Sequence, residues 1–429
     1  MPPGFTRKPP GRISMGIVKP QPPNRSRRPG PNPLPLHLAM ARSQYASAQA
    51  AFAQMTQHRG ATTLGRHWAD RYGHLPKAAV SRALKDYCEQ RLSRFLNGVE
   101  QYQSDSFSRP ASQPAIVCTF GGTRVLSHGG VGQTILLVPS LINPSWILDL
   151  LPARSFAAFL VERGFHVCSI DWGQPGLAEG RFGLEEYCLA RLVPAIAALS
   201  RERGPIHLIG YCLGGNIALA AALEAQRKVE AGVATFTAIA APWDFSAMGD
   251  AARRLVAQTY HDIKPVLART GVMPASALQA LFAQLDPTQI ERKFVRFGDL
   301  NPKDPEDRAA MDHFIAIEDW SNSGPDLAQA VVEETFIGFY GANTPAKGRW
   351  QVAGTPVDPS RLHCPAMILA AGDDRIVPKA STLALARQLP APHVISPNAG
   401  HVGMMVGSKA QSQCWTPVAD WLVHQSGRI

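Results

Sequence analysis

Residues 205–225, PIHLIGYCLGGNIALAAALEA, decide the fold of this chain. The apolar residues of 206–209 predict a short buried strand, and the apolar run that follows residue 215 predicts a helix. Between them, Gly210, Cys212 and Gly214 fill the pattern G-x-nucleophile-x-G, which places a reactive side chain, usually a serine, on a sharp turn between strand and helix. The stretch therefore predicts a strand–turn–helix unit with a cysteine at its turn.

Strands and helices alternate on both sides of this stretch. We expect strands at 134–141, 165–172, 234–242, 365–374 and 392–401, and helices at 154–164, 183–204 and 415–425. Alternation at this spacing predicts a mostly parallel sheet with helices on both of its faces. The fold class is therefore α/β.

The alternation is interrupted once and preceded by a different pattern. Residues 243–350 are helix-rich and too long for a loop, so we expect a helical cap insertion between two parts of one catalytic core, 111–242 and 351–429. Residues 39–110 are helical and poor in strands, which predicts a helical extension packed against the body. Its expected buried face is formed by Ala79, Leu84, Tyr87, Leu92, Phe95 and Leu96.

The positive charge of the chain is confined to its start. The formal net charge is +10, yet residues 1–69 contain ten Lys or Arg and no Asp or Glu, so the remainder carries 33 basic and 33 acidic residues and is neutral. Residues 1–38 are also rich in proline, and such a composition predicts a disordered basic tail. We expect removal of residues 1–36 to leave the stability and activity of the body unchanged, and any salt-sensitive adhesion to anionic surfaces to disappear.

The composition also excludes several classes of protein. The seven cysteines are odd in number and include no C-x-x-C pair, so neither a disulfide framework nor a cysteine metal cluster is expected, and a reducing cytoplasm fits best. The apolar runs are too short to form a transmembrane segment. These observations favour an ordinary globular enzyme or binding protein over a secreted or membrane-spanning one.

Two further strand ends carry residues that suit a cysteine nucleophile. Asp373 and Asp374 follow the strand expected at 365–374, and His401 follows the last expected strand. The order nucleophile, acid, histidine is that of α/β-hydrolases, and the cap insertion falls in the gap where such folds often carry a lid. Taken singly, each residue has a simpler explanation: a buried thiol, turn-forming aspartates or a structural histidine. The ordered set predicts a catalytic triad of Cys212, Asp374 and His401.

Several motifs together resemble the polyhydroxyalkanoate synthases of the PhaC family. They are LLVPSLINPSWILDL (136–150), SIDWGQPG (169–176), GYCLGG (210–215), EDWSNSGPD (318–326), FYGANTPAKGRWQVAGTPVD (339–358), GDDRIVP (372–378) and GHVGMMVGSK (400–409). The resemblance covers roughly residues 65–425 and implies an α/β-hydrolase fold with Cys212, Asp374 and His401 as catalytic residues. Asp374 is preferred over Asp373 because it stands two residues before the I-V-P of the family's acid motif. Ser140 and Asn216 depart from the family's usual proline and threonine, and neither is a catalytic position.

The resemblance implies polymerisation of (R)-3-hydroxyacyl-CoA into a growing polyester chain with release of CoA. Acyl-CoA is then the substrate, and no cofactor or metal is expected. A homodimer or a partner synthase subunit, and a cytoplasmic location at polymer granules, fit the same family. The Leu213 N–H and one N–H from Ser140, Leu141 or Ile142 are candidates for the oxyanion hole. Two alternatives remain open: a cysteine hydrolase of the dienelactone hydrolase or thioesterase type, and a catalytically silent granule-associated homologue.

Overall fold

The fold is built on one sheet of eight strands in the order β1-β2-β6-β3-β7-β8-β13-β14. The computed structural model describes residues 28–57, 63–110, 112–228 and 232–427. The strands are β1 (Ala115–Phe120), β2 (Thr123–Gly129), β3 (Thr134–Val138), β6 (His166–Asp171), β7 (Ile206–Tyr211), β8 (Val233–Ile239), β13 (Ala366–Leu369) and β14 (His393–Ile395). From β6 to β14 every neighbouring pair is parallel, as the sequence predicts.

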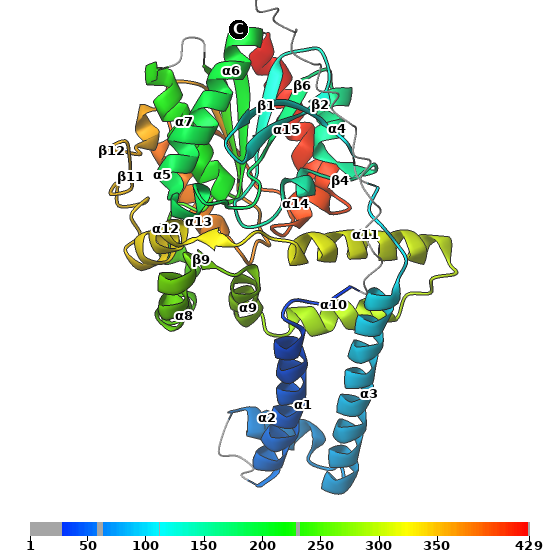
Figure 1. The fold of residues 1–429 in the computed structure, drawn as a ribbon. Coiled ribbons are helices and arrows are strands. Elements are labelled where there is room, and N and C mark those ends of the chain that lie inside the picture. The colour runs from blue at the N-terminus through cyan, green and yellow to red at the C-terminus, as the bar shows by residue number, and fades with distance from the viewer. Residues whose placement is uncertain (1–27, 58–62, 111, 229–231, 428–429) are drawn as a thin grey trace, which may run out of the picture.

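Side chains of successive strand residues enter different layers because their direction alternates along a strand. In β3, Leu136 and Val138 join one buried cluster, while Ile135 and Leu137 join another. The first cluster is covered by α5 (Leu184–Tyr187), α6 (Val193–Arg203), α7 (Leu213–Lys228) and α13 (Lys379–Gln388). The second is covered by α4 (Phe156–Glu162), α14 (Gly403–Val406) and α15 (Thr416–Ser426). Figure 1 shows the sheet between these two helical layers.

Sequence analysis missed the strands at one edge of the sheet. β1 and β2 form an antiparallel hairpin, and β2 pairs antiparallel with β6. Residues 115–129 were not recognised because polar and small residues interrupt the apolar pattern and β1 is largely exposed. An edge strand of an antiparallel pair needs only one buried face, so its sequence signal is weak.

The interruption at 243–350 is a layer of helices across one end of the sheet (Figure 1). It consists of η4 (Phe245–Met248), α8 (Asp250–Thr270), α9 (Ala275–Leu285), α10 (Gln289–Gly298), α11 (Pro305–Asn322), α12 (Gln329–Glu333) and η5 (Glu334–Gly341), with two short strands, β9 (Val272–Met273) and β10 (Leu327–Ala328). We call this layer the cap. The remaining short elements are η1 (Ser145–Leu148), β4 (Asp149–Leu151), β5 (Arg154–Ser155), η2 (Glu179–Arg181), η3 (Cys188–Leu192), β11 (Gln351–Val352), β12 (Thr355–Pro356), η6 (Pro359–Arg361) and η7 (Gln411–Trp415).

Three helices form an arm that projects from the cap, away from the sheet (Figure 1). They are α1 (Leu34–Gln57), α2 (Thr63–Tyr72) and α3 (Lys77–Ser104). The arm contacts the body through the cap: α3 and α1 share a buried cluster with α10 and α11 that includes Phe95, Tyr102, Phe294 and Met311. The expected buried face of α3 is wrong in part, since Ala79, Tyr87 and Leu96 are exposed. The buried positions are Cys88, Phe95, Gly98, Val99 and Tyr102.

The predicted boundary of the disordered tail at residue 38 is wrong, and the expectation that removal of residues 1–36 changes nothing therefore holds only for residues 1–27. Residues 1–27 lie outside the described part of the chain, but α1 already begins at Leu34 and residues 28–33 make specific contacts with the cap and α3. Proline was the misleading signal. Pro35 lies in the first turn of α1, where backbone N–H groups have no hydrogen-bond partner within the helix, so proline's lack of an N–H costs nothing there. Among the described helices, none combines the length and apolar character needed to cross a bilayer.

Candidate active site

The backbone holds Cys212 in a strained turn between β7 and α7. Its φ is +55°, a conformation that non-glycine residues rarely adopt and that clusters at functional sites. The two flanking glycines make the turn sterically feasible. A Cβ on Gly210 would lie 2.4 Å from the Cα of Gly215, and one on Gly214 would lie 2.3 Å from the carbonyl oxygens of residues 138 and 139. The G-x-C-x-G pattern is therefore a requirement of close packing at this turn.

His401 and Asp374 come together beside this turn. Nδ1 of His401 is 2.7 Å from Oδ2 of Asp374, and all three predicted triad residues are less than 10% exposed. The other carboxylate oxygen of Asp374 accepts the backbone N–H groups of Ile376 and Val377 at 2.9 and 2.8 Å. The carboxylate is thus fixed by its own turn, while Asp373 is exposed to solvent. Of the two aspartates, Asp374 is therefore the one that contacts His401, and its catalytic role stays a prediction.

The surroundings of His401 raise the pKa of its imidazole. Burial alone would lower its pKa, but the negative charge of Cys212, hydrogen bonds with Asp374 and Cys212, and the charge of Asp374 outweigh burial. Together they raise the pKa of His401 to about 10 from an ordinary value of 6.5. The raised pKa favours a charged imidazolium beside Cys212 at neutral pH.

We expect the pKa of His401 to fall when the sulfur is removed. In the wild type the ring should keep its proton from pH 7 to near pH 10, whereas in Cys212→Ala it should lose the proton at lower pH. The titration can be followed by NMR of histidine-labelled protein, with the His401 signals assigned through His401→Gln. His128 is an internal reference, because its lowered pKa results mainly from burial in another part of the fold. Identical His401 titration in both proteins would contradict the assigned pairing.

Cys212 and His401 face a cavity of about 500 Å³. Cys212 and His401 line it from the sheet side, and the loop after β3 adds Ser140 and Asn143. Most of its other walls belong to the cap and are apolar, as represented by Val256, Leu278, Leu281, Phe282, Phe336, Phe339 and Tyr340. The expected position of the cap over the site agrees with this lining. The cavity suits an apolar acyl group presented to the sulfur.

Comparison with known proteins places the chain in a family. The family model described as "alpha/beta hydrolase fold" matches residues 125–408. The poly(3-hydroxyalkanoate) polymerase subunit PhaC of Synechocystis sp. is 30% identical over 299 residues, which is 67% of this chain and 77% of that protein. The chain belongs to the PhaC family of α/β-hydrolase-fold proteins. The PhaC subunits of Haloferax mediterranei and Haloarcula marismortui are 29% and 26% identical, each over 68% of this chain. The matches span only 59% and 61% of these two haloarchaeal proteins.

In this PhaC-family chain, the candidate N–H groups for an oxyanion hole belong to residues just after β7 and just after β3. The Leu213 N–H is at the start of α7, where a helix leaves its first N–H groups unpaired by backbone. The Ile142 N–H is engaged by the Ser140 hydroxyl at 3.3 Å. Of the three predicted partners for Leu213, Ser140 and Leu141 therefore remain the better candidates. Pro139, which precedes them, has no N–H to offer.

Sequence reasoning assigned no role to Tyr340, which also lines the cavity. Burial and the nearby charge of Cys212 raise the pKa of Tyr340 above its ordinary value, so the phenol keeps its proton. Its ring packs against Phe245, with 4.9 Å between ring centroids. The only signal was its place in the PhaC-like motif of 339–358. In the described residues, no cluster of His, Cys, Asp or Glu is arranged to hold a metal ion.

Proposed function

We propose that this protein is an acyltransferase that polymerises (R)-3-hydroxyacyl-CoA into a polyester and releases CoA. The observation that carries the proposal is a cysteine, rather than a serine, at the elbow, supported by His401 and Asp374 and facing an apolar cavity. The PhaC relatives, which are poly(3-hydroxyalkanoate) polymerase subunits, supply the substrate class.

The chemistry begins with transfer of the acyl group to sulfur. The Cys212 thiolate attacks the thioester carbonyl of the acyl-CoA, the carbon–sulfur bond to CoA breaks, and the CoA thiolate leaves with the proton held by His401. One thioester has replaced another, so the acyl group stays activated. A serine would form a more stable oxyester instead. Retained activation is what a polymerase needs, because the bound acyl group must still be transferred.

Chain growth then uses the same residues. His401 takes the proton of a 3-hydroxyl group while the hydroxyl oxygen attacks the thioester carbonyl. A new ester bond forms, the bond to Cys212 breaks, and the sulfur leaves as thiolate beside the protonated histidine. Asp374 holds the imidazole in its working orientation, a role whose removal is costly in other triads. Backbone N–H groups near Leu213 and Ser140 would stabilise the oxyanion of both steps by about 3–4 kcal/mol per donor.

The deciding experiment is CoA release from (R)-3-hydroxybutyryl-CoA, followed by size analysis of the product. We expect CoA release with formation of polyester that precipitates or scatters light. Free 3-hydroxybutyrate as the only product would show a cysteine hydrolase of the thioesterase type. The proposal would be contradicted if the folded chain released no CoA, either alone or together with the second subunit that assembles with a PhaC subunit.

A partner subunit and a granule surface are part of the same proposal. Several relatives are named as polymerase subunits, which supports assembly with a second chain. The growing polyester is insoluble, so the enzyme that makes it remains with the granule. The basic residues of 1–27, which lie outside the described residues, would favour an anionic surface there.

A further inference from the structure

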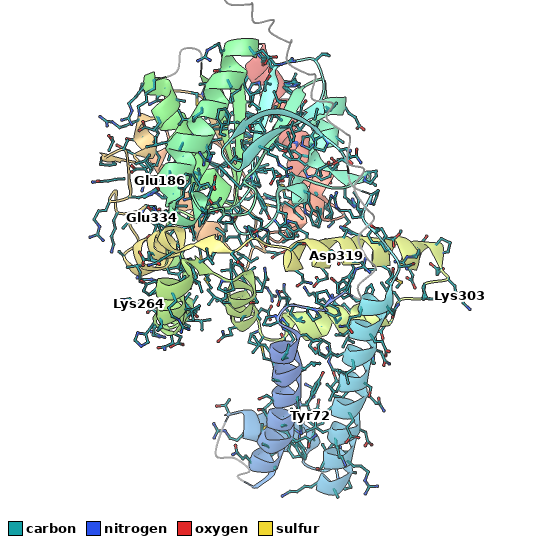
Figure 2. The ribbon with its side chains drawn as sticks, in the orientation of Figure 1. Tyr72, Glu186, Lys264, Lys303, Asp319 and Glu334 are labelled. Carbon is teal, nitrogen blue, oxygen red and sulfur yellow. The ribbon has the colours of Figure 1, made fainter. Side chains whose placement is uncertain are left out.

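The chain before α1 is fastened to the cap and arm by one arginine. The Arg28 Nε donates to both carboxylate oxygens of Asp319 at 2.9 and 3.1 Å, and its other nitrogens donate to the carbonyls of Asp105 and Phe107. The guanidinium also lies 5.6 Å from the ring centre of Tyr102, whose hydroxyl donates to the same Asp319 at 2.7 Å. Figure 2 shows Asp319 on α11. One N–H shared between two carboxylate oxygens, two backbone carbonyls and the adjacent Tyr102 ring thus hold Arg28 in a defined position.

Residues 28–33, which we call the strap, continue from this anchor across the cap. Gly30 turns the chain with φ +87°, and the Asn32 N–H donates to the side chain of Asn322 at 3.0 Å. Gln103 donates to the carbonyl of Pro29 at 3.2 Å. The strap is therefore fixed at both ends and in its middle. Figure 1 shows it beside α10, on the opposite side of α11 from the sheet.

The strap forms part of the wall of the catalytic cavity. Pro31 and Asn32 line it, as does His37 in the first turns of α1. Cys212 and His401 line the same cavity from the sheet side, so this cavity extends from the sulfur to the strap. Next to the strap, the wall turns polar. Lys293 and the buried Glu318 form an ion pair at 2.6 Å, and both line the cavity.

We propose that the strap closes the far end of the acyl cavity and thereby limits the length of acyl chain that can reach Cys212. The inference rests on the proposed function for its substrate, but the wall itself is a feature of the cavity. A short 3-hydroxyacyl group fits between the sulfur and the strap. A longer one meets Pro31, Asn32 and the polar ion pair, and would have to desolvate Lys293 and Glu318 without replacing their hydrogen bonds. Arg28, through Asp319, sets the position of this stop.

The test compares access to the Cys212 sulfur for short and long reagents. N-ethylmaleimide and N-dodecylmaleimide are reacted with the full chain and with Arg28→Ala, and labelling of the Cys212 peptide is quantified by mass spectrometry, which separates it from the other six cysteines. A chain beginning at Leu34 tests removal of the whole strap. Circular dichroism and the thermal midpoint confirm that each variant is folded.

Two controls separate the strap from its surroundings. A chain beginning at Arg28 keeps the strap and removes only residues 1–27. Arg94→Ala breaks another ion pair between α3 and the cap, with Asp299, and neither of those residues lines the cavity. We expect the ratio of dodecyl to ethyl labelling to rise about tenfold or more in Arg28→Ala and in the chain from Leu34, and to stay unchanged in both controls.

Activity gives the second measurement. The ratio of kcat/KM for 3-hydroxyoctanoyl-CoA to that for 3-hydroxybutyryl-CoA should rise with the labelling ratio. An unchanged labelling ratio in both folded strap variants would overturn the inference, whatever the activity. A changed labelling ratio in a chain that polymerises neither substrate would uphold the strap and refute the proposed function.

Discussion

Cys212→Ser should fold normally and lose polymerisation by about a thousandfold or more, which is the scale for loss of a nucleophile that acts with its base as a unit. Serine is close to cysteine in size, and the glycines that the turn requires, Gly210 and Gly214, are unchanged. We therefore expect the fold to be retained. An oxyester on serine is a poorer acyl donor than a thioester, and chain growth should stall after the first acyl transfer. CoA release and polymer yield measure the loss, and mass spectrometry should find the stalled acyl-serine.

Cys118→Ser is the matched control for this variant. Cys118 is a half-buried thiol in β1 and does not line the cavity, so its exchange should leave CoA release close to that of the wild type. Cys212→Ala completes the series because it offers no nucleophile at all. Substantial polymer from folded Cys212→Ala would exclude a covalent intermediate at this residue.

Asp374→Asn should reduce kcat by about 10³–10⁴-fold with little change in the fold. The amide can still accept the N–H groups of Ile376 and Val377, but it no longer carries the charge that supports the His401 cation. The pKa of His401 should therefore fall, and the neutral imidazole can carry its proton on the wrong ring nitrogen. Rate measurements over pH 6–9, combined with the histidine titration, test both effects in one protein.

Asp373→Asn provides the comparison, since it changes the same charge one residue away. Asp373 is exposed. Its backbone N–H donates a hydrogen bond to the carbonyl of Ala399, and this bond does not involve the side chain. Its kcat should stay within about threefold of the wild type, as expected for a surface substitution. Equal losses in the two variants would mean that negative charge at this turn matters rather than the carboxylate hydrogen-bonded to His401.

The parallel α/β part of the fold was predictable because its signals are local and repeated. Buried parallel strands such as β7 read as apolar runs, and the polar residues at their carboxyl ends mark one edge of the sheet. Cys212, Asp374 and His401 could be grouped from their order alone. The β1–β2 hairpin could not, because its exposed residues dilute the strand pattern.

The polar details of the site depend on distances that sequence does not encode. Nothing in the order of residues indicates that the Ser140 hydroxyl accepts a hydrogen bond from the Ile142 N–H. Nor does it indicate that Tyr340 lies close enough to Cys212 for the two to interact electrostatically. The strap was missed for a stronger reason. Arg28 and Asp319 are 291 residues apart in the sequence, so their contact leaves no local pattern. The proline-rich, basic composition around Arg28 instead favours disorder.

The buried cluster shared by the arm and the cap has a mechanical consequence. Phe95 and Tyr102 of α3 meet Phe294 of α10 edge to face, and Tyr102 likewise meets Phe314 of α11, in a cluster separate from the two that hold the sheet. Local opening that separates α10 from the sheet must therefore carry α3 with it, since splitting the aromatic contacts costs more than moving both helices together. We therefore expect the arm to move together with α10, which lines the cavity through Lys293. Amide exchange in α3 and α10 should accordingly rise and fall as one unit.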